Sequence, residues 1–219
     1  MKRLKPLAWV HVPWAGDAFV NALLQHPGLC PGFRGRVSFT DKELQQSGFR
    51  KEVSRACAGA FIRNYDSPPF SVGFGDAYFR SVGRAIIILR HPARRTLAEF
   101  LSRSSESGQS WSIKSLASQR RGCVVRTIVR LGRSPCLTGQ SAPAEREAAQ
   151  AVKLLQQGFA FVGIAEEWEL TVCLFHLIFG GSCQSLEIQD SQEKVENSTS
   201  PVTAGDALSE VDPDPLDEQ

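Results

Sequence analysis

Two turns, each between an apolar run and a helical segment, carry side chains that could bind an anion. The first turn follows Leu7–Val12, and the second follows Arg84–Leu89, where Arg90 stands at the end of the run. In parallel α/β sheets, ligands bind beyond the carboxyl ends of the strands, where helix N-termini offer N–H groups and a positive dipole to phosphate. A guanidinium such as that of Arg90 can hold a phosphate with two hydrogen bonds. The two turns therefore predict a phosphate site.

The elements that must position these turns are strands alternating with helices. Leu7–Val12, Arg84–Leu89 and Phe159–Ile164 are short apolar runs, and the isoleucine triplet in the second is typical of a strand buried on both faces. This alternation indicates an α/β fold, a three-layer sandwich with a mainly parallel central sheet. Apolar spacing and capping signals predict helices over these ranges: Ala18–His26, Thr40 to about Asn64, Pro92 up to the polar linker Arg103–Gly108, Trp111–Leu131, Pro143–Gln157 and Glu166–Phe179.

The formal net charge of +2 is the sum of two large opposite terms. From Glu187 to the end there are ten acidic residues and a single base, Lys194, so this part carries −9 and the preceding 186 residues carry +11. A cationic body favours an anionic ligand or partner. We expect residues 1–185 to form one α/β domain and residues 186–219 to form an acidic, disordered tail.

The six cysteines form no CxxC pair and have no histidine at metal-ligand spacing, so no metal site is expected. Cys123 with Cys136, or Cys173 with Cys183, are close enough in sequence to form disulfides in a secretory compartment. Buried free thiols are the preferred interpretation, because Met1–Pro6 leads into a strand without a secretory signal. No apolar run approaches the ~18 residues of a membrane-spanning helix. As written, the chain is expected to stay in the cytoplasm.

Three segments resemble motifs of Golgi-type carbohydrate sulfotransferases. Trp9–Leu24 (WVHVPWAGDAFVNALL) is similar to their 5′-phosphosulfate loop, and Ile87–Phe100 (IILRHPARRTLAEF) is similar to their 3′-phosphate motif. Phe161–Gly181 is similar to a later family segment, and the order and spacing of the three agree with the family. The resemblance implies a P-loop NTPase-like fold that binds 3′-phosphoadenosine 5′-phosphosulfate (PAPS) and transfers sulfuryl to a hydroxyl acceptor, usually a glycan. It implies the Golgi lumen if the N-terminus is incomplete.

The resemblance also assigns nucleotide-binding positions. In the family, backbone amides and a lysine of the first loop hold the 5′-phosphosulfate, and an arginine and a serine of the second motif hold the 3′-phosphate. The corresponding residues of this chain are Pro13, Trp14, Ala15, Gly16, Asp17, Ala18, Phe19, Arg90 and Ala98. The chain departs from the pattern because Trp14 replaces the lysine, Asp17 replaces a glycine and Ala98 replaces the serine. An electrostatic donor at such a site is worth about 3 to 4 kcal/mol in the transition state, so sulfuryl transfer is expected to be weak or lost.

Two functions stay open. The chain is either a degenerate sulfotransferase with a glycan acceptor, or a catalytically inactive relative that binds a nucleotide, a sulfated glycan or a protein partner through its basic surface. Nucleic-acid binding through the arginines between Arg120 and Arg133 ranks last, since no aromatic residues are interleaved with them. The solvated face of a helix is the preferred interpretation for Arg94, Arg95 and Arg103.

The histidines and the C-terminal stretch have their own interpretations. His11 and His176 are interpreted as buried structural residues, whereas His91 directly follows the arginine of the phosphate motif and is a candidate ligand. Glu166 corresponds to the family glutamate and complements the dipole at the start of the last helix. Leu208–Gln219 resembles the family segment before the final helix, so the acidic stretch is also interpreted as a surface loop.

Overall fold

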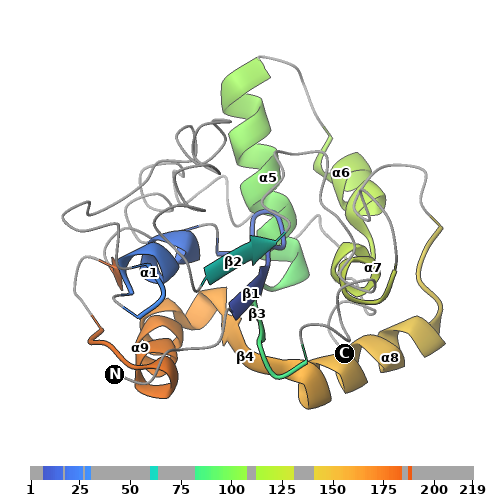
Figure 1. Cartoon of the computed structure of the whole chain (residues 1–219). Helices are drawn as coiled ribbons and strands as arrows, with labels where there is room; N and C mark the ends of the chain where they lie inside the picture. Colours follow the sequence, from blue (N-terminus) through green and yellow to red (C-terminus); the bar gives the residue numbers. More distant parts are fainter. Residues whose placement is uncertain are drawn as a thin grey trace.

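The computed structural model of the chain describes residues 7–16, 18–26, 28–30, 60–63, 82–107, 112–130, 141–183 and 187–188. Within these ranges four strands form one sheet in the order β2-β1-β3-β4, and each neighbouring pair is parallel (Figure 1). The strands are β1 (Leu7–Val10), β2 (Ala60–Arg63), β3 (Ala85–Leu89) and β4 (Phe159–Ile164). The predicted α/β class with a parallel sheet is confirmed.

Helices cover both sides of this sheet. They are α1 (Phe19–Gln25), α5 (Pro92–Ser107), α6 (Ile113–Arg120), α7 (Cys123–Val129), α8 (Glu145–Gly158) and α9 (Trp168–Phe179), with the 3-10 turn η2 (Ala165–Glu167) before α9. Figure 1 shows α1 and α9 on one side of the strands and α6, α7 and α8 on the other. The two layers are joined through β3, whose successive side chains point to opposite faces. Ile86 and Ile88 pack with α1 and α9, whereas Ala85 and Ile87 pack with α7 and α8.

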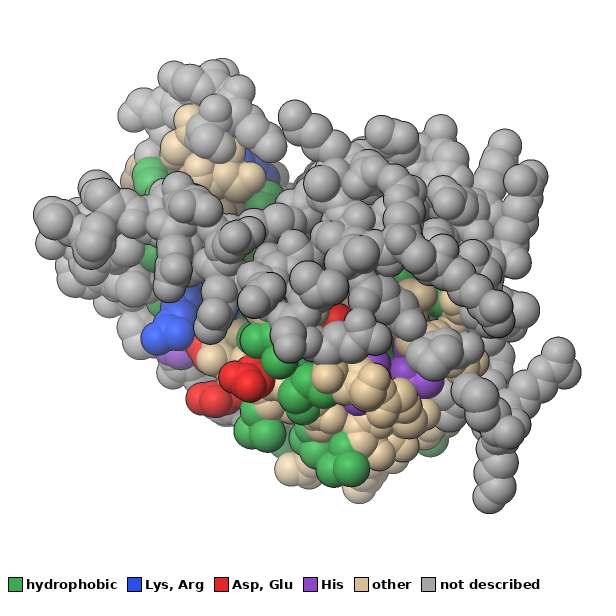
Figure 2. Space-filling model, turned by 90° about the vertical axis from the view of Figure 1, so that its left-hand side faces the viewer, with side chains coloured by type: hydrophobic (Ala, Val, Ile, Leu, Met, Phe, Trp, Pro, Cys, Tyr) green, Lys and Arg blue, Asp and Glu red, His purple; other side chains and the backbone are tan. Residues whose placement is uncertain are grey.

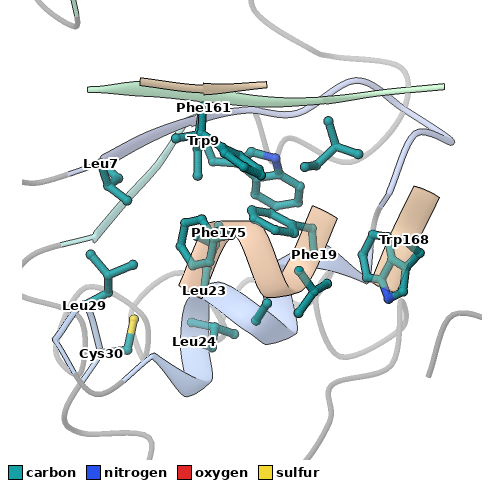
Figure 3. Packing of buried hydrophobic residues seen from close by; sticks show 14 residues of the cluster. Leu7, Trp9, Phe19, Leu23, Leu24, Leu29, Cys30, Phe161, Trp168 and Phe175 are labelled. Carbon is teal, nitrogen blue, oxygen red and sulfur yellow. The ribbon is translucent and has the colours of Figure 1, made fainter. Parts of the chain in front are cut away.

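The core on the side of α1 and α9 contains a cluster of aromatic rings among aliphatic side chains (Figure 3). Phe19 is fully buried, and its ring centroid lies 5.0 Å from that of Phe175 and 6.2 Å from those of Phe161 and Trp168. The pairs of Phe19 with Phe175 and Trp168 are edge-to-face and the pair with Phe161 is stacked, and aromatic pairs of these kinds add about 0.5–1.5 kcal/mol each beyond the area that they bury. The first turn of α1 is therefore anchored in the core by Phe19, directly after the loop that follows β1.

Strand β2 corrects one sequence-based prediction. The helix expected from Thr40 to about Asn64 covers residues 60–63, but these residues form a strand paired in parallel with β1, with Leu7 opposite Ala60 and Val10 opposite Arg63. The rest of that predicted helix lies outside the described residues. Four residues are too few for a periodic signal, and among the described strands β2 pairs with β1, which lies about 50 residues earlier in the sequence.

Two helix boundaries also differ from the expected ones. The polar linker predicted at Arg103–Gly108 is wrong, because α5 continues to Ser107 and Arg103 forms an ion pair with Glu99 one turn earlier, at 2.7 Å. The single helix predicted over Trp111–Leu131 is split into α6 and α7 at Gly122, whose φ of 65° is left-handed. Glycine adopts this conformation without steric cost, so the chain turns there.

Helix α9 carries apolar side chains on two opposite faces, and one of these faces is exposed. Figure 2 shows hydrophobic side chains gathered on the lower part of the molecule, and the exposed apolar residues of α9 are Leu170, Leu174, Leu177 and Ile178. The opposite face packs on β4, the last strand in the described sheet order. There Thr171 accepts a hydrogen bond from the Ile164 N–H at 2.9 Å and donates one to the Ile164 carbonyl at 2.8 Å. None of the described helices combines the length and the apolarity needed to cross a bilayer.

The cysteines of the described residues form disulfides, so the preferred interpretation of free thiols is wrong. Cys173 on α9 is disulfide-bonded to Cys183, with Cα atoms 4.8 Å apart. Cys30 and Cys123 each take part in a disulfide as well. The alternative pairing of Cys173 with Cys183 is confirmed. Glu187, which the sequence assigns to the acidic tail, is buried against the domain, while residues 189–219 lie outside the described part of the chain.

Candidate functional site

The candidate site lies at the edge where the parallel strands end. Because β1 and β3 are neighbours and run in the same direction, the turns after them open on the same edge. Strand β2, the next described strand in the chain, lies on one side of β1, whereas β3 and β4 lie on its other side. The direction in which successive strands are added therefore reverses between β1 and β3. Ligands of open α/β sheets bind at such a reversal, beyond the carboxyl ends of the strands. The sheet therefore places the two predicted turns together.

The loop after β1 is held by its own backbone. The Ala15 N–H donates to the Val12 carbonyl at 3.1 Å, and the Phe19 N–H donates to the Gly16 carbonyl at 2.9 Å. These two amides are consequently turned into the loop rather than towards a ligand. Trp14 has a φ of 65°, a left-handed conformation that is strained for a bulky residue.

Gly16 permits the loop to lie directly on the core. Its φ is +73°, and a Cβ atom at this position would meet Ile88 Cγ2 at 2.6 Å and Trp168 Cζ3 at 3.4 Å. The loop after β1 therefore rests on β3 and on the first residue of α9. This close approach of backbone to core is the reason why glycine is needed here.

Two hydrogen bonds join the turns that follow different strands. Arg90 Nη1 donates to the Trp14 carbonyl oxygen at 3.3 Å, which links the turn after β3 to the loop after β1. The His91 N–H donates to Glu166 Oε1 at 3.1 Å, which links the same turn to η2 after β4. The Glu166 carboxylate thus lies at the N-terminus of α5, where it complements the helix dipole. An anion approaching the same N-terminus would meet this negative charge.

The predicted nucleotide-binding residues whose positions the structure describes fall into three groups. Pro13, Trp14, Gly16 and Arg90 are partly buried at the strand ends. The side chains of Ala15 and Phe19 are buried in the core on opposite sides of the sheet, so neither side chain contacts a ligand at the edge. Ala18 packs against the core beside α1, and Ala98 is partly buried within α5. Asp17 lies outside the described residues. The structure thus brings Arg90 to the first loop and turns Phe19 away from it.

The other arginines that the sequence singled out are mostly bound within the protein. Arg95 is 4 % exposed, so its assignment to a solvated helix face is wrong. Arg120 donates to both carboxylate oxygens of the buried Glu99, at 2.8 Å and 2.6 Å. Arg126 is buried and donates to the Arg121 carbonyl. These side chains therefore stabilise the packing of α5, α6 and α7.

Arg130 makes a similar contact at the start of α8. It donates to both carboxylate oxygens of Glu147, at 2.8 Å and 3.0 Å. The Glu147 carboxylate also accepts a hydrogen bond from the Ala144 N–H at 2.9 Å. The hydrogen bond from Arg130 is the main reason why the pKa of Glu147 is lowered to about 2.

A second set of ionisable residues meets in the core, and the sequence did not indicate that they would meet. His26 after α1, His176 on α9 and Glu187 are all buried, and the two imidazole rings stack with centroids 5.6 Å apart. The interpretation of His176 as a buried structural residue is confirmed. Its Nε2 atom lies 3.0 Å from the Glu187 carboxylate. No sequence signal pairs these residues, because they come from three separate segments.

The histidines of this group have opposite pKa shifts. Burial lowers the pKa of His26 from 6.5, and this effect outweighs the hydrogen bond to the Gly180 carbonyl. Burial also opposes the charged form of His176, but the hydrogen bond and the negative charge of Glu187 outweigh it and raise the pKa of His176. Within the stacked pair, His26 therefore loses its proton at a lower pH than His176.

Comparisons with protein-family models, with curated proteins and with solved structures find no match for this chain. Among the residues with a described position, no group of three or more histidine, cysteine, aspartate or glutamate side chains is arranged to hold a metal ion. The arrangement at the strand ends offers one guanidinium, the backbone of a tight loop and a carboxylate. Of these groups, the Arg90 guanidinium can bind an anionic ligand, whereas the Glu166 carboxylate opposes it and the loop residue Trp14 supplies no positive charge.

Proposed function

We propose that this protein is a sulfotransferase-like protein whose strand-end turns bind a 3′-phosphoadenosine nucleotide, and whose transfer of sulfuryl from PAPS to a carbohydrate hydroxyl is weak or lost. The observation that supports it best is the hydrogen bond of 3.3 Å between Arg90 Nη1 and the Trp14 carbonyl. It joins the two segments that resemble the phosphate motifs, although they are separated by 76 residues in the sequence. The corresponding fold is a P-loop NTPase-like three-layer sandwich.

The weak or absent catalysis follows from the charges at the site. As sulfuryl leaves PAPS, negative charge develops on the 5′-phosphate oxygens, and a cation beside them stabilises the transition state. Trp14 replaces the lysine that would supply this cation. Glu166, whose carboxylate accepts the His91 N–H, adds a negative charge at the start of α5. Losing one such donor costs about 10²–10³ in rate, so any residual transfer should be slow.

The disulfide between Cys173 and Cys183 bears on where this function is carried out. Disulfides persist in oxidising compartments and are rare in the reducing cytosol. This agrees with a Golgi-type sulfotransferase relative better than with a cytoplasmic protein. A glycan hydroxyl, the usual acceptor of the family, is available in that compartment.

A catalytically inactive family member is the second candidate, and the position of Glu166 favours it. A protein that only binds needs no cation at the leaving oxygen, and a guanidinium such as that of Arg90 can hold a phosphate. Both candidate functions predict nucleotide binding, but they differ in whether sulfuryl is transferred. A single pair of measurements therefore separates them.

The first measurement is a calorimetric titration of the full chain with 3′-phosphoadenosine 5′-phosphate. Arg90→Ala should weaken binding by about 10–100-fold, because a hydrogen bond to a charged group contributes ~1.5–3 kcal/mol. Arg94→Ala is the matched control, since Arg94 is exposed on α5 and should change affinity by less than about twofold. Absence of binding by the folded wild-type chain would reject the proposal.

The second measurement is sulfate transfer from PAPS to a desulfated glycan. Trp14→Lys should raise the rate above that of the wild type, because it places a cation at the leaving oxygen. Binding without turnover in the wild type supports the inactive family member. Wild-type turnover as fast as that of Trp14→Lys would refute the role assigned to Trp14.

A further inference from the structure

The first residue of α9, Trp168, lies between the loop after β1 and the start of the acidic C-terminal stretch. Its side chain is buried in the cluster that packs α1 and α9 on the sheet. The Trp168 Nε1–H donates to the Glu187 carbonyl oxygen at 2.9 Å, and this hydrogen bond is itself buried. The orientation of the indole is therefore fixed, because turning the ring would break a hydrogen bond inside the protein.

The same indole supports the loop after β1 at two points. Its Cζ3 atom lies 3.4 Å from the position that a Cβ atom would take on Gly16. Its ring also meets the ring of Phe19, the first residue of α1, edge to face, with centroids 6.2 Å apart (Figure 3). The loop is consequently packed on Trp168 both at Gly16 and where the chain enters α1.

The hydrogen bonds printed within the loop give it a shape, whereas its place on the sheet depends on what it rests on. The Ala15 N–H donates to the Val12 carbonyl and the Phe19 N–H donates to the Gly16 carbonyl, so each joins nearby residues of one segment. Gly16 rests on Ile88 of β3 and on the Trp168 indole. Trp168 therefore couples the place of the loop to the chain that follows β4.

The chain that follows β4 also reaches the other predicted turn. Glu166, two residues before Trp168, accepts a hydrogen bond from the His91 N–H at 3.1 Å. Residues 166–168 thus contact the loop after β1 through Trp168 and the turn after β3 through Glu166. The two turns that are proposed to bind the nucleotide are joined by this third turn, in addition to the hydrogen bond between Arg90 and Trp14.

We propose that Trp168 is a positioning residue of the nucleotide site, an inference that rests on the function proposed for the strand-end turns. Because it is buried, Trp168 acts through Gly16 and Phe19, by holding the loop after β1 in its place beside the turn that carries Arg90. The Glu187 carbonyl acts one step further away, by fixing the indole. A site that is held in place before the ligand arrives loses less freedom on binding and has a higher affinity.

The first test is amide hydrogen exchange of the ligand-free full chain, and it needs no nucleotide. Trp168→Phe keeps an aromatic ring but removes the Nε1–H that donates to Glu187. The amides of Ala15 and Phe19, which are hydrogen-bonded at the loop, should exchange about tenfold faster, the upper end of what one neutral hydrogen bond contributes.

Val172→Ala is the matched control for this exchange experiment. Val172 is fully buried one turn further along α9, in the same cluster as Trp168. Amides of β3 report on unfolding of the domain and should exchange faster in both variants, whereas the loop amides report on local opening and should exchange faster in Trp168→Phe alone. Loop amides that are unchanged in Trp168→Phe, or equally faster in both variants, would overturn the proposal.

The second test is calorimetric titration of the folded variants with 3′-phosphoadenosine 5′-phosphate. Trp168→Phe should raise the Kd by up to about tenfold, and Val172→Ala should leave it within about twofold of the wild type. Wild-type chain that binds no nucleotide rejects the proposed function itself. Wild-type binding that Trp168→Phe leaves unchanged rejects only the role of Trp168.

A third measurement uses the wild type alone, so it holds even if Trp168→Phe fails to fold. Coupling between two sites is reciprocal, so a nucleotide bound at the strand ends must act back on the Trp168 hydrogen bond. The NMR signal of the Trp168 Nε1–H should therefore shift in step with the nucleotide titration, although the indole is buried. A signal that stays in place at saturation contradicts the coupling.

Discussion

Replacing Gly16 by alanine tests whether the loop after β1 is packed as closely on β3 as the structure shows. Two separate effects oppose the new methyl group. The φ of +73° is unfavourable for any residue with a Cβ atom, and the Cβ would lie 2.6 Å from Ile88 Cγ2. Ile88 is fully buried in β3, so its side chain has little room to move. Both effects raise the free energy of the folded state.

Gly83 offers a matched control that separates the two effects. It has nearly the same φ, +68°, but a Cβ atom there would meet nothing within 4 Å. The left-handed conformation alone should cost Gly83→Ala about 1–2 kcal/mol. Gly16→Ala should cost this amount plus about 1–3 kcal/mol for overpacking against Ile88. The difference between the two variants is therefore the free energy of the steric contact.

Urea unfolding monitored by tryptophan fluorescence measures both variants under the same conditions. We expect Gly16→Ala to lower the free energy of unfolding by about 2–5 kcal/mol. In the background of Ile88→Ala, which removes the Cγ2 atom, the cost of Gly16→Ala should fall towards that of Gly83→Ala. Equal losses for Gly16→Ala and Gly83→Ala in the wild-type background would refute the close contact between the loop and β3.

Two further predictions concern a covalent link and an ion pair. Replacing Cys173 and Cys183 together by serine removes a link across a sequence separation of 10, and loop-closure entropy gives a loss of about 2.7 kcal/mol, measurable by urea unfolding. An unchanged unfolding midpoint would show that this disulfide does not constrain the unfolded chain. The hydrogen bond from Arg130 lowers the pKa of Glu147 from 4.5 to about 2, so the stabilisation from this carboxylate is present above pH 4.5 and is lost as the pH falls towards 2. Arg130→Ala should raise that pKa towards 4.5 in a carboxyl NMR titration, and an unchanged value would contradict the assigned cause.

The parts of the fold that could be predicted are those with a local signal. The apolar run containing the isoleucine triplet indicated β3, and the apolar spacing before Pro27 indicated α1. The stretch Phe159–Ile164 indicated β4 for the same reason. Strand β2 was missed because its four residues become a strand only by pairing with β1. Pairing of this kind depends on residues distant in the sequence, which no local pattern records.

The candidate site was predicted in part for similar reasons. The order of strands and turns is local information, and it placed Trp14 and Arg90 at one sheet edge, where they are hydrogen-bonded. The contact between Glu166 and His91 could not be predicted, because it depends on how η2 meets α5. The stacked pair of His26 and His176 requires the ends of α1 and α9 to meet, and the Cys173–Cys183 pairing requires knowledge of the redox compartment.

The hydroxyl of Thr171 has a consequence for how the chain behaves among copies of itself. In the described sheet order β4 is the outer strand, and the exposed edge of a sheet is a template on which a strand from another molecule can pair. Thr171 occupies both the N–H and the carbonyl of Ile164, which point to the same side of the strand. At its carboxyl end, β4 therefore has no backbone groups to offer at Ile164 to an incoming strand. One side chain of α9 thus satisfies both backbone groups of the last residue of β4.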